Sequence, residues 1–227
     1  MENSSAIVVM TRYPQPGFTK TRLRELLSHE QCAAFYWSCL EDLGTELGKL
    51  SRQVFVGVAG DGDWKRLRGL FPPGTRFFAQ VGDRLGERML HGFEQVFSEG
   101  FKPVVMVGGD APELNAETLK DALEILLRFD CVIQPTIDGG FCLLGLNENH
   151  PELFSLSNYS HSQVYEQTQS LLNRAGVHWK ALPVGYDVDT AEDLRSYYRR
   201  LQDVPKLRNT QTGKFVWRIF TNEGSQR

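Results

Sequence analysis

Hydrophobic and polar positions follow two patterns that alternate along the chain. Short runs that are apolar at every position, such as residues 104–107, are typical of strands covered on both faces by helices. Longer segments between them carry an apolar residue at every third or fourth position, which predicts amphipathic helices. This alternation predicts an α/β fold with a mostly parallel central sheet.

The boundaries of the elements follow from the same patterns. Strands are predicted over residues 6–11, 54–58, 76–80, 104–107, 131–135, 141–146 and 178–182. Helices are predicted over residues 28–50, 64–71, 85–97, 116–128, 161–175 and 191–201. Beyond Leu201 the pattern is lost, and residues 215–220 predict an added strand or a docking segment. We expect one domain over residues 1–201 and a tail over residues 202–227 that is docked or partly disordered.

Composition and charge narrow the class of partner. The chain has 227 residues, of which 41% are hydrophobic, enough for one well-buried core. The net charge is -3 and the basic residues are scattered, which disfavours nucleic acid and membrane surfaces and favours a small-molecule partner. The oligomeric state is left open.

The N-terminus and the cysteines indicate the compartment. The sequence MENSS leads into a short apolar strand without a basic segment or a long apolar one. We therefore expect no signal peptide, no membrane span and a cytoplasmic protein. The four cysteines form no CxxC pair and lie in apolar segments, which is typical of reduced buried thiols.

The segment PVVMVGGDAPEL places an acidic residue directly after the most apolar run. Gly108 and Gly109 allow the chain to turn there. Asp110 is therefore expected at the carboxyl end of a central strand, where open α/β sheets bind ligands. The alternative is a loop aspartate that caps the following helix.

The loop after the first predicted strand, RYPQPGFTKTRL, is rich in cations. Arg12, Lys20 and Arg22 surround a turn that contains Gly17 and two prolines, which stiffen it. A stiff cationic loop ahead of a helix is a candidate phosphate-binding site, with these four residues as substrate-binding candidates. A solvated basic loop is the alternative. The order GxxxxGK[ST] is absent, which disfavours a P-loop ATPase.

Two more acidic loops follow predicted strands. Asp138 precedes Gly139 and Gly140, which leave room for a ligand to approach the backbone. Asp187 and Asp189 alternate, so an extended segment would point both carboxylates to the same side.

A further candidate is Arg88, in the first turns of the helix predicted over residues 85–97. This helix begins where a strand ends, so Arg88 either faces the binding cleft or is an ordinary solvated charge.

Together, the acidic loops and the cationic loop suit a divalent metal and a diphosphate. Mg²⁺ and Mn²⁺ prefer carboxylate, phosphate and water oxygens. We expect Mg²⁺ or Mn²⁺ as cofactor, with Asp110 and Asp187 as ligands. Asp138 and Asp189 remain as candidate catalytic bases.

Five segments, in order, resemble the nucleotide-diphospho-sugar transferase (GT-A-like) superfamily, and within it the glycosyltransferase family associated with radical SAM and selenodomain proteins. They are YPQPGFTKTRL, GDRLGERM, VVMVGGDAPEL, PTIDGGFCLLGL and YDVDTAEDL, and they span nearly the whole chain except the tail. The resemblance implies a Rossmann-like, three-layer αβα sandwich of GT-A type that binds a nucleotide at the strand ends. It further implies metal–diphosphate binding at Asp110 and phosphate contacts from Lys20 and Arg22.

Three functions are compatible with these features. A glycosyltransferase would move a sugar from a nucleotide-diphospho-sugar to an acceptor hydroxyl, with Asp138 or Asp189 as base. A nucleotidyltransferase would use Lys20 and Arg22 to stabilise charge while pyrophosphate leaves a nucleoside triphosphate. A non-catalytic nucleotide-binding module is the third. The resemblance ranks sugar transfer first.

Overall fold

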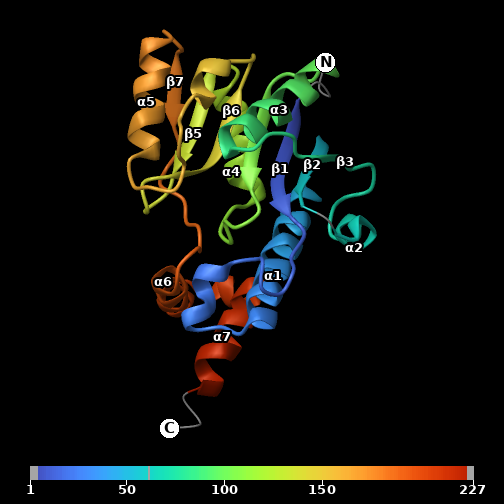
Figure 1. Ribbon diagram of the computed structural model, residues 1–227, viewed down its shortest axis with the longest axis vertical. Helices are drawn as coiled ribbons and strands as arrows, with labels where there is room; N and C mark the ends of the chain where they lie inside the picture. Colours follow the sequence, from blue (N-terminus) through green and yellow to red (C-terminus); the bar gives the residue numbers. More distant parts are fainter. Residues whose placement is uncertain (1–4, 61, 224–227) are drawn as a thin grey trace.

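The computed structural model describes residues 5–60 and 62–223. Its centre is a seven-stranded sheet with the order β3-β2-β1-β4-β6-β5-β7 (Figure 1). The strands are β1 (Ala6–Arg12), β2 (Gln53–Ala59), β3 (Arg76–Ala79), β4 (Val104–Gly108), β5 (Cys131–Pro135), β6 (Phe141–Leu146) and β7 (Trp179–Ala181). Strand β6 runs antiparallel to β4 and β5, and the other pairings are parallel. The predicted α/β fold with a mostly parallel sheet is confirmed.

Helices cover both faces of the sheet (Figure 1). The α-helices are α1 (His29–Leu47), α2 (Trp64–Arg68), α3 (Leu85–Ser98), α4 (Ala116–Ile125), α5 (Val164–Arg174), α6 (Ala191–Asp203) and α7 (Gln211–Glu223). Short 3-10 helices are η1 (Thr21–Glu25), η2 (Pro151–Phe154) and η3 (Pro205–Asn209). Helix α5 begins three residues after the predicted start, so His161 belongs to the loop before it.

Side-chain alternation along the strands divides the interior into two cores. In β1, Ile7 and Val9 face the core shared with α1, α4, α6 and α7, whereas Ala6 and Val8 face the core shared with α3 and α5. Each strand of this kind buries apolar side chains on both faces, which is why its sequence shows no polar alternation. The result is the three-layer αβα sandwich that the family resemblance implies.

The C-terminal segment is docked and helical, so the docking alternative holds and the added strand is wrong. Residues 215–220 form no strand but part of α7, which packs against α1 and α6. Val216 is fully buried, and the rings of Phe215 and Phe35 lie 6.0 Å apart. The carboxylate of Asp42 on α1 accepts hydrogen bonds from the backbone of Gln211 and Thr212 at 2.7 and 2.8 Å and so fixes the start of the helix.

The remaining expectations concern the cysteines and the membrane. Cys32, Cys39, Cys131 and Cys142 are free and buried, as expected for reduced thiols. Within the part of the chain that the structure describes, no helix has the length and apolar character needed to cross a membrane. The expectation that the sequence starting at residues 1–4 is no signal peptide, and the expectation of partial disorder where it concerns residues 224–227, lie outside the described residues.

Candidate active site

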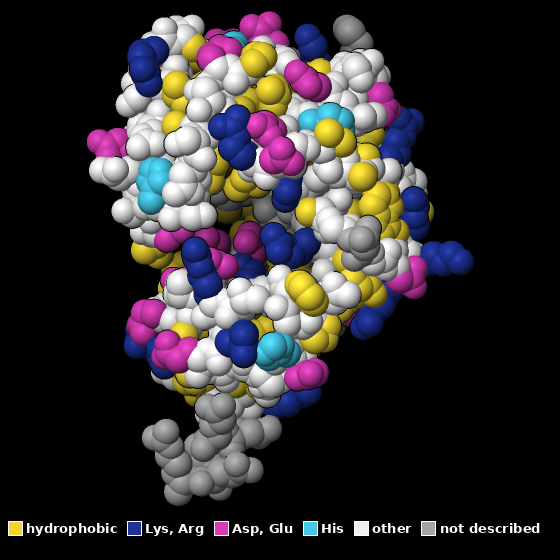
Figure 2. Space-filling model, in the orientation of Figure 1, with side chains coloured by type: hydrophobic (Ala, Val, Ile, Leu, Met, Phe, Trp, Pro, Cys, Tyr) yellow, Lys and Arg dark blue, Asp and Glu magenta, His cyan; other side chains and the backbone are white. Residues whose placement is uncertain are grey.

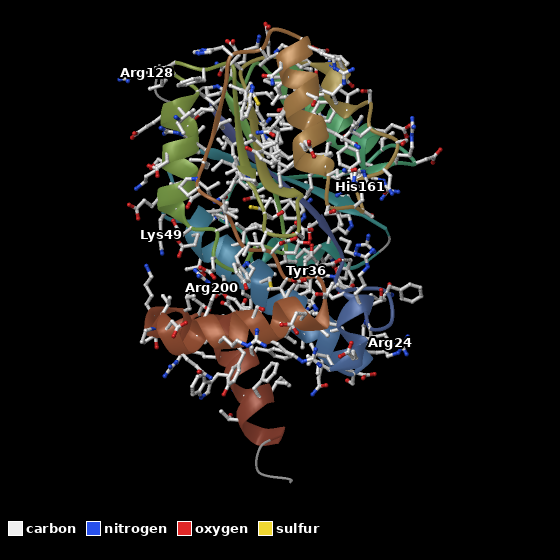
Figure 3. All side chains as sticks on the ribbon, turned by 90° about the vertical axis from the view of Figure 1, so that its left-hand side faces the viewer. Arg24, Tyr36, Lys49, Arg128, His161 and Arg200 are labelled. Carbon is white, nitrogen blue, oxygen red and sulfur yellow. The ribbon has the colours of Figure 1, made fainter. Side chains whose placement is uncertain are left out.

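A cavity of about 610 Å³ opens at the carboxyl ends of the central strands. It appears as the hollow at mid-height in Figure 2, rimmed by acidic and basic side chains. Its walls come from both helical layers, as the positions of Tyr36 on α1 and His161 before α5 indicate (Figure 3). Of the predicted site residues, the cavity is lined by Arg12, Arg22, Arg88, Asp110, Asp138, Gly140, Asp187 and Asp189. A second cavity of about 230 Å³ lies around Lys20 and shares Asp110 and Asp189 with the first.

Asp110 lies in the turn that follows β4 and does not cap a helix. The N-cap of α4 is Asn115, whose side chain accepts a hydrogen bond from the backbone of Thr118 at 3.0 Å. The turn is held tightly, because a Cβ atom at Gly109 would come within 2.7 Å of Leu40 and of the Tyr36 hydroxyl. The capping alternative is therefore wrong, and Asp110 faces the cavity.

Lys20 forms a buried ion-pair network with two of the acidic residues. Its Nζ donates to Oδ2 of Asp110 at 3.0 Å and to Oδ1 of Asp189 at 3.3 Å. Nη1 of Arg22 donates to Oδ2 of Asp189 at 2.9 Å. Burial alone would lower the pKa of Lys20, but Asp110 and Asp189 outweigh burial and raise it. Burial would likewise raise the pKa of Asp110, and Lys20 holds it below the usual value.

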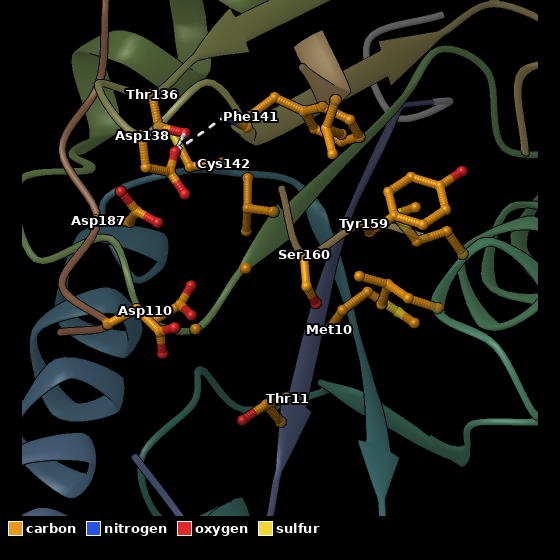
Figure 4. Close-up of a pocket in the computed structure, with 18 of the residues that line it drawn as sticks. Met10, Thr11, Asp110, Thr136, Asp138, Phe141, Cys142, Tyr159, Ser160 and Asp187 are labelled. Carbon is orange, nitrogen blue, oxygen red and sulfur yellow. Dashed lines mark hydrogen bonds between the residues drawn. The ribbon is translucent and has the colours of Figure 1, made fainter. Parts of the chain in front are cut away.

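Asp138 and Asp187 belong to the same acidic surface, and neither forms an ion pair with the described residues. Oδ1 of Asp138 accepts hydrogen bonds from Thr136 Oγ1 at 2.6 Å and from the backbone N–H of Gly140 at 2.9 Å, which fixes the carboxylate. Burial, followed by the charges of Asp138 and Asp110, raises the pKa of Asp187 to about 7. Figure 4 shows the side chains of Asp110, Asp138 and Asp187 around the same part of the cavity.

The segment that carries Asp187 and Asp189 is held by contacts between distant residues. The backbone N–H of Val188 donates to the carbonyl oxygen of Asp110 at 3.3 Å. Arg200 of α6 forms an ion pair with Glu113 and lies over the ring of Tyr186, 5.1 Å from its centroid. These contacts bring the loop after β4 and the segment before α6 together, which places their carboxylates at one cavity.

Arg88 both lines the cavity and supports its wall. Its Nε donates to the carbonyl oxygen of Gly82 at 2.8 Å, which links α3 to the loop after β3. The side chain is thus engaged with the backbone at the cavity, and a contact between Arg88 and a ligand stays a prediction.

Gly17 and Gly139 have structural reasons to be glycine. Both have positive φ angles, 83° and 86°. A Cβ atom at Gly139 would lie 1.9 Å from the carbonyl oxygen of Ser162, and one at Gly17 would lie 3.0 Å from Nδ1 of His29. The space beside each glycine is thus filled by the protein, and a ligand contact at either stays a prediction.

Several cavity residues were not found from the sequence. Tyr36 lies beneath Asp110, and its hydroxyl is 2.9 Å from Oγ1 of Thr11, but its place in a helical apolar pattern made it look like a core residue. Nε2 of Gln80 donates to the carbonyl oxygens of Thr11 and Gly57, both at 2.8 Å, and so joins the ends of β1 and β2. The cavity also has an apolar lining of Met10, Met89, Met106, Phe141, Leu144 and Tyr159. Figure 4 shows Met10 and Tyr159 on the side of the view away from Asp138 and Asp187.

The available donors fit a hard divalent cation that arrives with its own phosphate ligands. Within residues 5–60 and 62–223, no three His, Cys, Asp or Glu side chains are close enough to form a preformed metal cage. Mg²⁺ usually binds only one or two protein carboxylates, with phosphate and water oxygens completing the shell. Asp110, Asp138 and Asp187 offer oxygen atoms of this kind at the cavity.

Comparison with solved structures identifies similar proteins. A crystal structure from Desulfovibrio desulfuricans G20, provisionally described as a nucleotide-diphospho-sugar transferase, is 31% identical to this chain with a TM-score of 0.87, and the match covers 94% of each chain. This likeness confirms the superfamily resemblance.

Two more distant structures share the fold alone. A cytidylyltransferase from Leptospira borgpetersenii is 14% identical with a TM-score of 0.60, and the match covers 98% of this chain and 96% of that one. The 4-diphosphocytidyl-2C-methyl-D-erythritol synthase of Anaerococcus prevotii is 11% identical with a TM-score of 0.58, and the match covers 88% and 97%.

Sequence comparison gives the family. Nothing among the curated proteins matches this chain. The family model DUF2064, described as an uncharacterized protein conserved in bacteria, matches residues 43–161, a segment that includes α3, Asp110, Asp138 and His161. With this match over about half of its length, the chain belongs to the DUF2064 family.

Proposed function

We propose that this protein is a metal-dependent transferase that binds a nucleotide-diphospho-sugar and transfers the sugar to an acceptor hydroxyl. The observation that carries the proposal is the meeting of cationic and acidic loops at one cavity, which is lined by Arg12 and Arg22 and by Asp110, Asp138 and Asp187. The cavity volume of about 610 Å³ falls within the range of small-molecule sites, about 300–1,000 Å³.

The cationic loop supplies the diphosphate site in this proposal. Arg22 has a side chain that is 61% exposed and uses only Nη1 on Asp189, which leaves other N–H groups for a ligand. Nη1 of Arg12 donates to the carbonyl oxygen of Phe18 at 3.3 Å, which braces the loop. Charge-assisted hydrogen bonds from guanidinium groups are well suited to phosphate oxygens.

The acidic loops supply the metal site. Asp110 and Asp187 would hold Mg²⁺ or Mn²⁺, with Asp138 beside them. The ion supplies positive charge that stabilises the leaving diphosphate. The effect of Asp138 and Asp110 on Asp187, whose pKa they raise, supports this assignment, since a divalent cation would relieve the repulsion among these carboxylates.

In the reaction, the acceptor oxygen bonds to the anomeric carbon while the bond from that carbon to the diphosphate oxygen breaks. Nucleoside diphosphate leaves, and a carboxylate takes the proton of the acceptor hydroxyl. The contacts favour Asp138 over Asp189 as this base. Both oxygens of Asp189 accept hydrogen bonds from cations, whereas among the described residues Oδ2 of Asp138 accepts none.

The group released tests the proposal. With Mn²⁺ present, the protein should hydrolyse a nucleotide-diphospho-sugar slowly to nucleoside diphosphate, because water replaces the missing acceptor. A panel of sugar donors and nucleoside triphosphates is incubated with the protein, and nucleoside diphosphate and pyrophosphate are quantified separately. Release of pyrophosphate from a triphosphate, without turnover of any sugar donor, would establish nucleotidyl transfer instead.

A further inference from the structure

Lys20 adopts a backbone conformation that is unusual for a residue with a side chain. Its φ and ψ angles are 50° and 42°, and among the described residues it is the non-glycine residue with positive φ. This left-handed region is disfavoured for residues other than glycine. Such strain persists only where surrounding contacts hold it, and it is common at functional sites.

The ammonium group of Lys20 lies behind the carboxylates it contacts. The Lys20 side chain is 6% exposed, whereas those of Asp110 and Asp189 are 39% and 40% exposed. Lys20 lines the small cavity, and the two carboxylates line both cavities. A ligand in the large cavity therefore contacts carboxylates whose negative charge is already partly balanced by the buried ammonium of Lys20.

This arrangement opposes binding of a metal ion by itself. A divalent cation on Asp110 would lie near a buried positive charge that is 3.0 Å from Oδ2 of the same carboxylate. Two cations held by one carboxylate, one of them the buried ammonium of Lys20, repel each other more strongly than they would in water. Arg22, which contacts Asp189 from the exposed side, exerts a smaller effect because solvent screens its charge.

We propose that Lys20 is an internal counter-ion that keeps divalent metal off Asp110 in the free protein and moves to a phosphate group when the nucleotide binds. The inference rests on the proposed function and adds the order of binding: the metal ion and the diphosphate bind together. The flexible stem and three donors of lysine allow its ammonium to exchange carboxylate for phosphate oxygens without a change of backbone. The small cavity of about 230 Å³ gives the side chain space for this movement.

Binding of Mn²⁺ alone, without nucleotide, tests the inference. Free Mn²⁺ is measured by electron paramagnetic resonance during titration of the wild type, Lys20→Met and the control Arg22→Met. A nearby charge changes the proton affinity of a carboxylate about tenfold or more, and we expect a gain of at least about tenfold in Mn²⁺ affinity for Lys20→Met. Arg22→Met should stay within about twofold of the wild type.

A melting experiment gives a second readout. Lys20→Met should unfold at a lower temperature than the wild type in chelator, because Asp110 and Asp189 lose their buried partner. Added Mn²⁺ should raise its melting temperature more than that of the wild type, by mass action. If Lys20→Met does not fold, Lys20→Met with Asp189→Asn removes the charge of one of the two carboxylates that lose Lys20, and Asp189→Asn alone is its control.

Unchanged Mn²⁺ affinity in the Lys20 variants overturns the inference. Weaker Mn²⁺ affinity also overturns it and shows that Lys20 supports metal binding. The proposed function is judged separately on the wild type, by release of nucleoside diphosphate from a sugar donor. A wild type that turns over a donor, with no gain in Mn²⁺ affinity on loss of Lys20, refutes the counter-ion role alone. A gain in affinity without turnover of any donor refutes sugar transfer and retains the counter-ion role.

Discussion

Asp187 and Asp138 lie on one acidic surface of the cavity, where Asp187 is half-buried and Asp138 is exposed, and burial, Asp138 and Asp110 raise the pKa of Asp187 to about 7. Its ordinary value in an unfolded chain is about 3.9. Between these values the folded protein binds more protons than the unfolded chain, so folding stability falls as the pH rises through this window. The ionised cluster therefore destabilises the free protein at pH 8, as is common at functional sites.

Asp187→Asn should consequently stabilise the metal-free protein. In chelator we expect the melting temperature to rise by a few degrees at pH 8, since about 1 kcal/mol corresponds to about 2–4 °C in a domain of this size. The gain should shrink at pH 5, where Asp187 of the wild type is protonated. Glu124→Gln, on an exposed face of α4, should change neither value. An equal gain at both pH values would contradict the electrostatic origin.

Arg22→Ala should weaken the binding of a nucleoside diphosphate by about tenfold or more, because a hydrogen bond to a charged group contributes about 1.5–3 kcal/mol. The affinity for the bare nucleoside should be unchanged. Isothermal titration calorimetry with both ligands measures the difference. Arg24→Ala, an exposed arginine of the same 3-10 helix, is the control. Equal losses for both ligands would remove Arg22 from the phosphate site.

Asp138→Asn should lower kcat by about 10²- to 10⁴-fold, the range typical of a general base, while donor affinity stays close to that of the wild type. The amide can still accept the hydrogen bonds from Thr136 and Gly140 through its oxygen, so the loop should keep its shape. Asp189→Asn should instead reduce donor affinity more than kcat, because it releases Lys20 and Arg22. The opposite pattern in steady-state kinetics would exchange the two roles.

Val216→Ala should destabilise the protein by about 2 kcal/mol, since Val216 is fully buried between α7 and α1. Lys214→Ala, on the exposed face of α7, should have little effect. Truncation after Asp203 removes the whole helix and uncovers the surface around Phe35, so we expect aggregation. Denaturant unfolding and light scattering measure the two effects. A stable monomer after truncation would show that α7 is dispensable.

Features that depend on local sequence were predicted well. The apolar run of β4 and the glycines after it placed Asp110 at a strand end, because a buried strand and its turn are encoded within a few residues. Contacts between distant segments were not predictable: Lys20 and Asp189 are 169 positions apart, and Lys20 and Asp110 are 90 apart. Helix α7 was missed because its apolar residues form a short β-branched and aromatic run at residues 215–220, which fits a strand as well as a helix.

The strand order around β1 and β4 has a consequence for how this site varies. From β1 the chain continues outward to β2 and β3 on one side, whereas from β4 the neighbouring strands are β6, β5 and β7 on the other. The loops that leave β1 and β4 start from adjacent parallel strands and meet where Lys20 contacts Asp110, so the position of the crevice beside them is set by the path of the backbone. Substitution of the charged side chains removes the groups that bind a ligand but leaves the backbone that forms the crevice unchanged. New ligand preferences are thus accessible through the two loops alone, while the sheet beneath them stays unchanged.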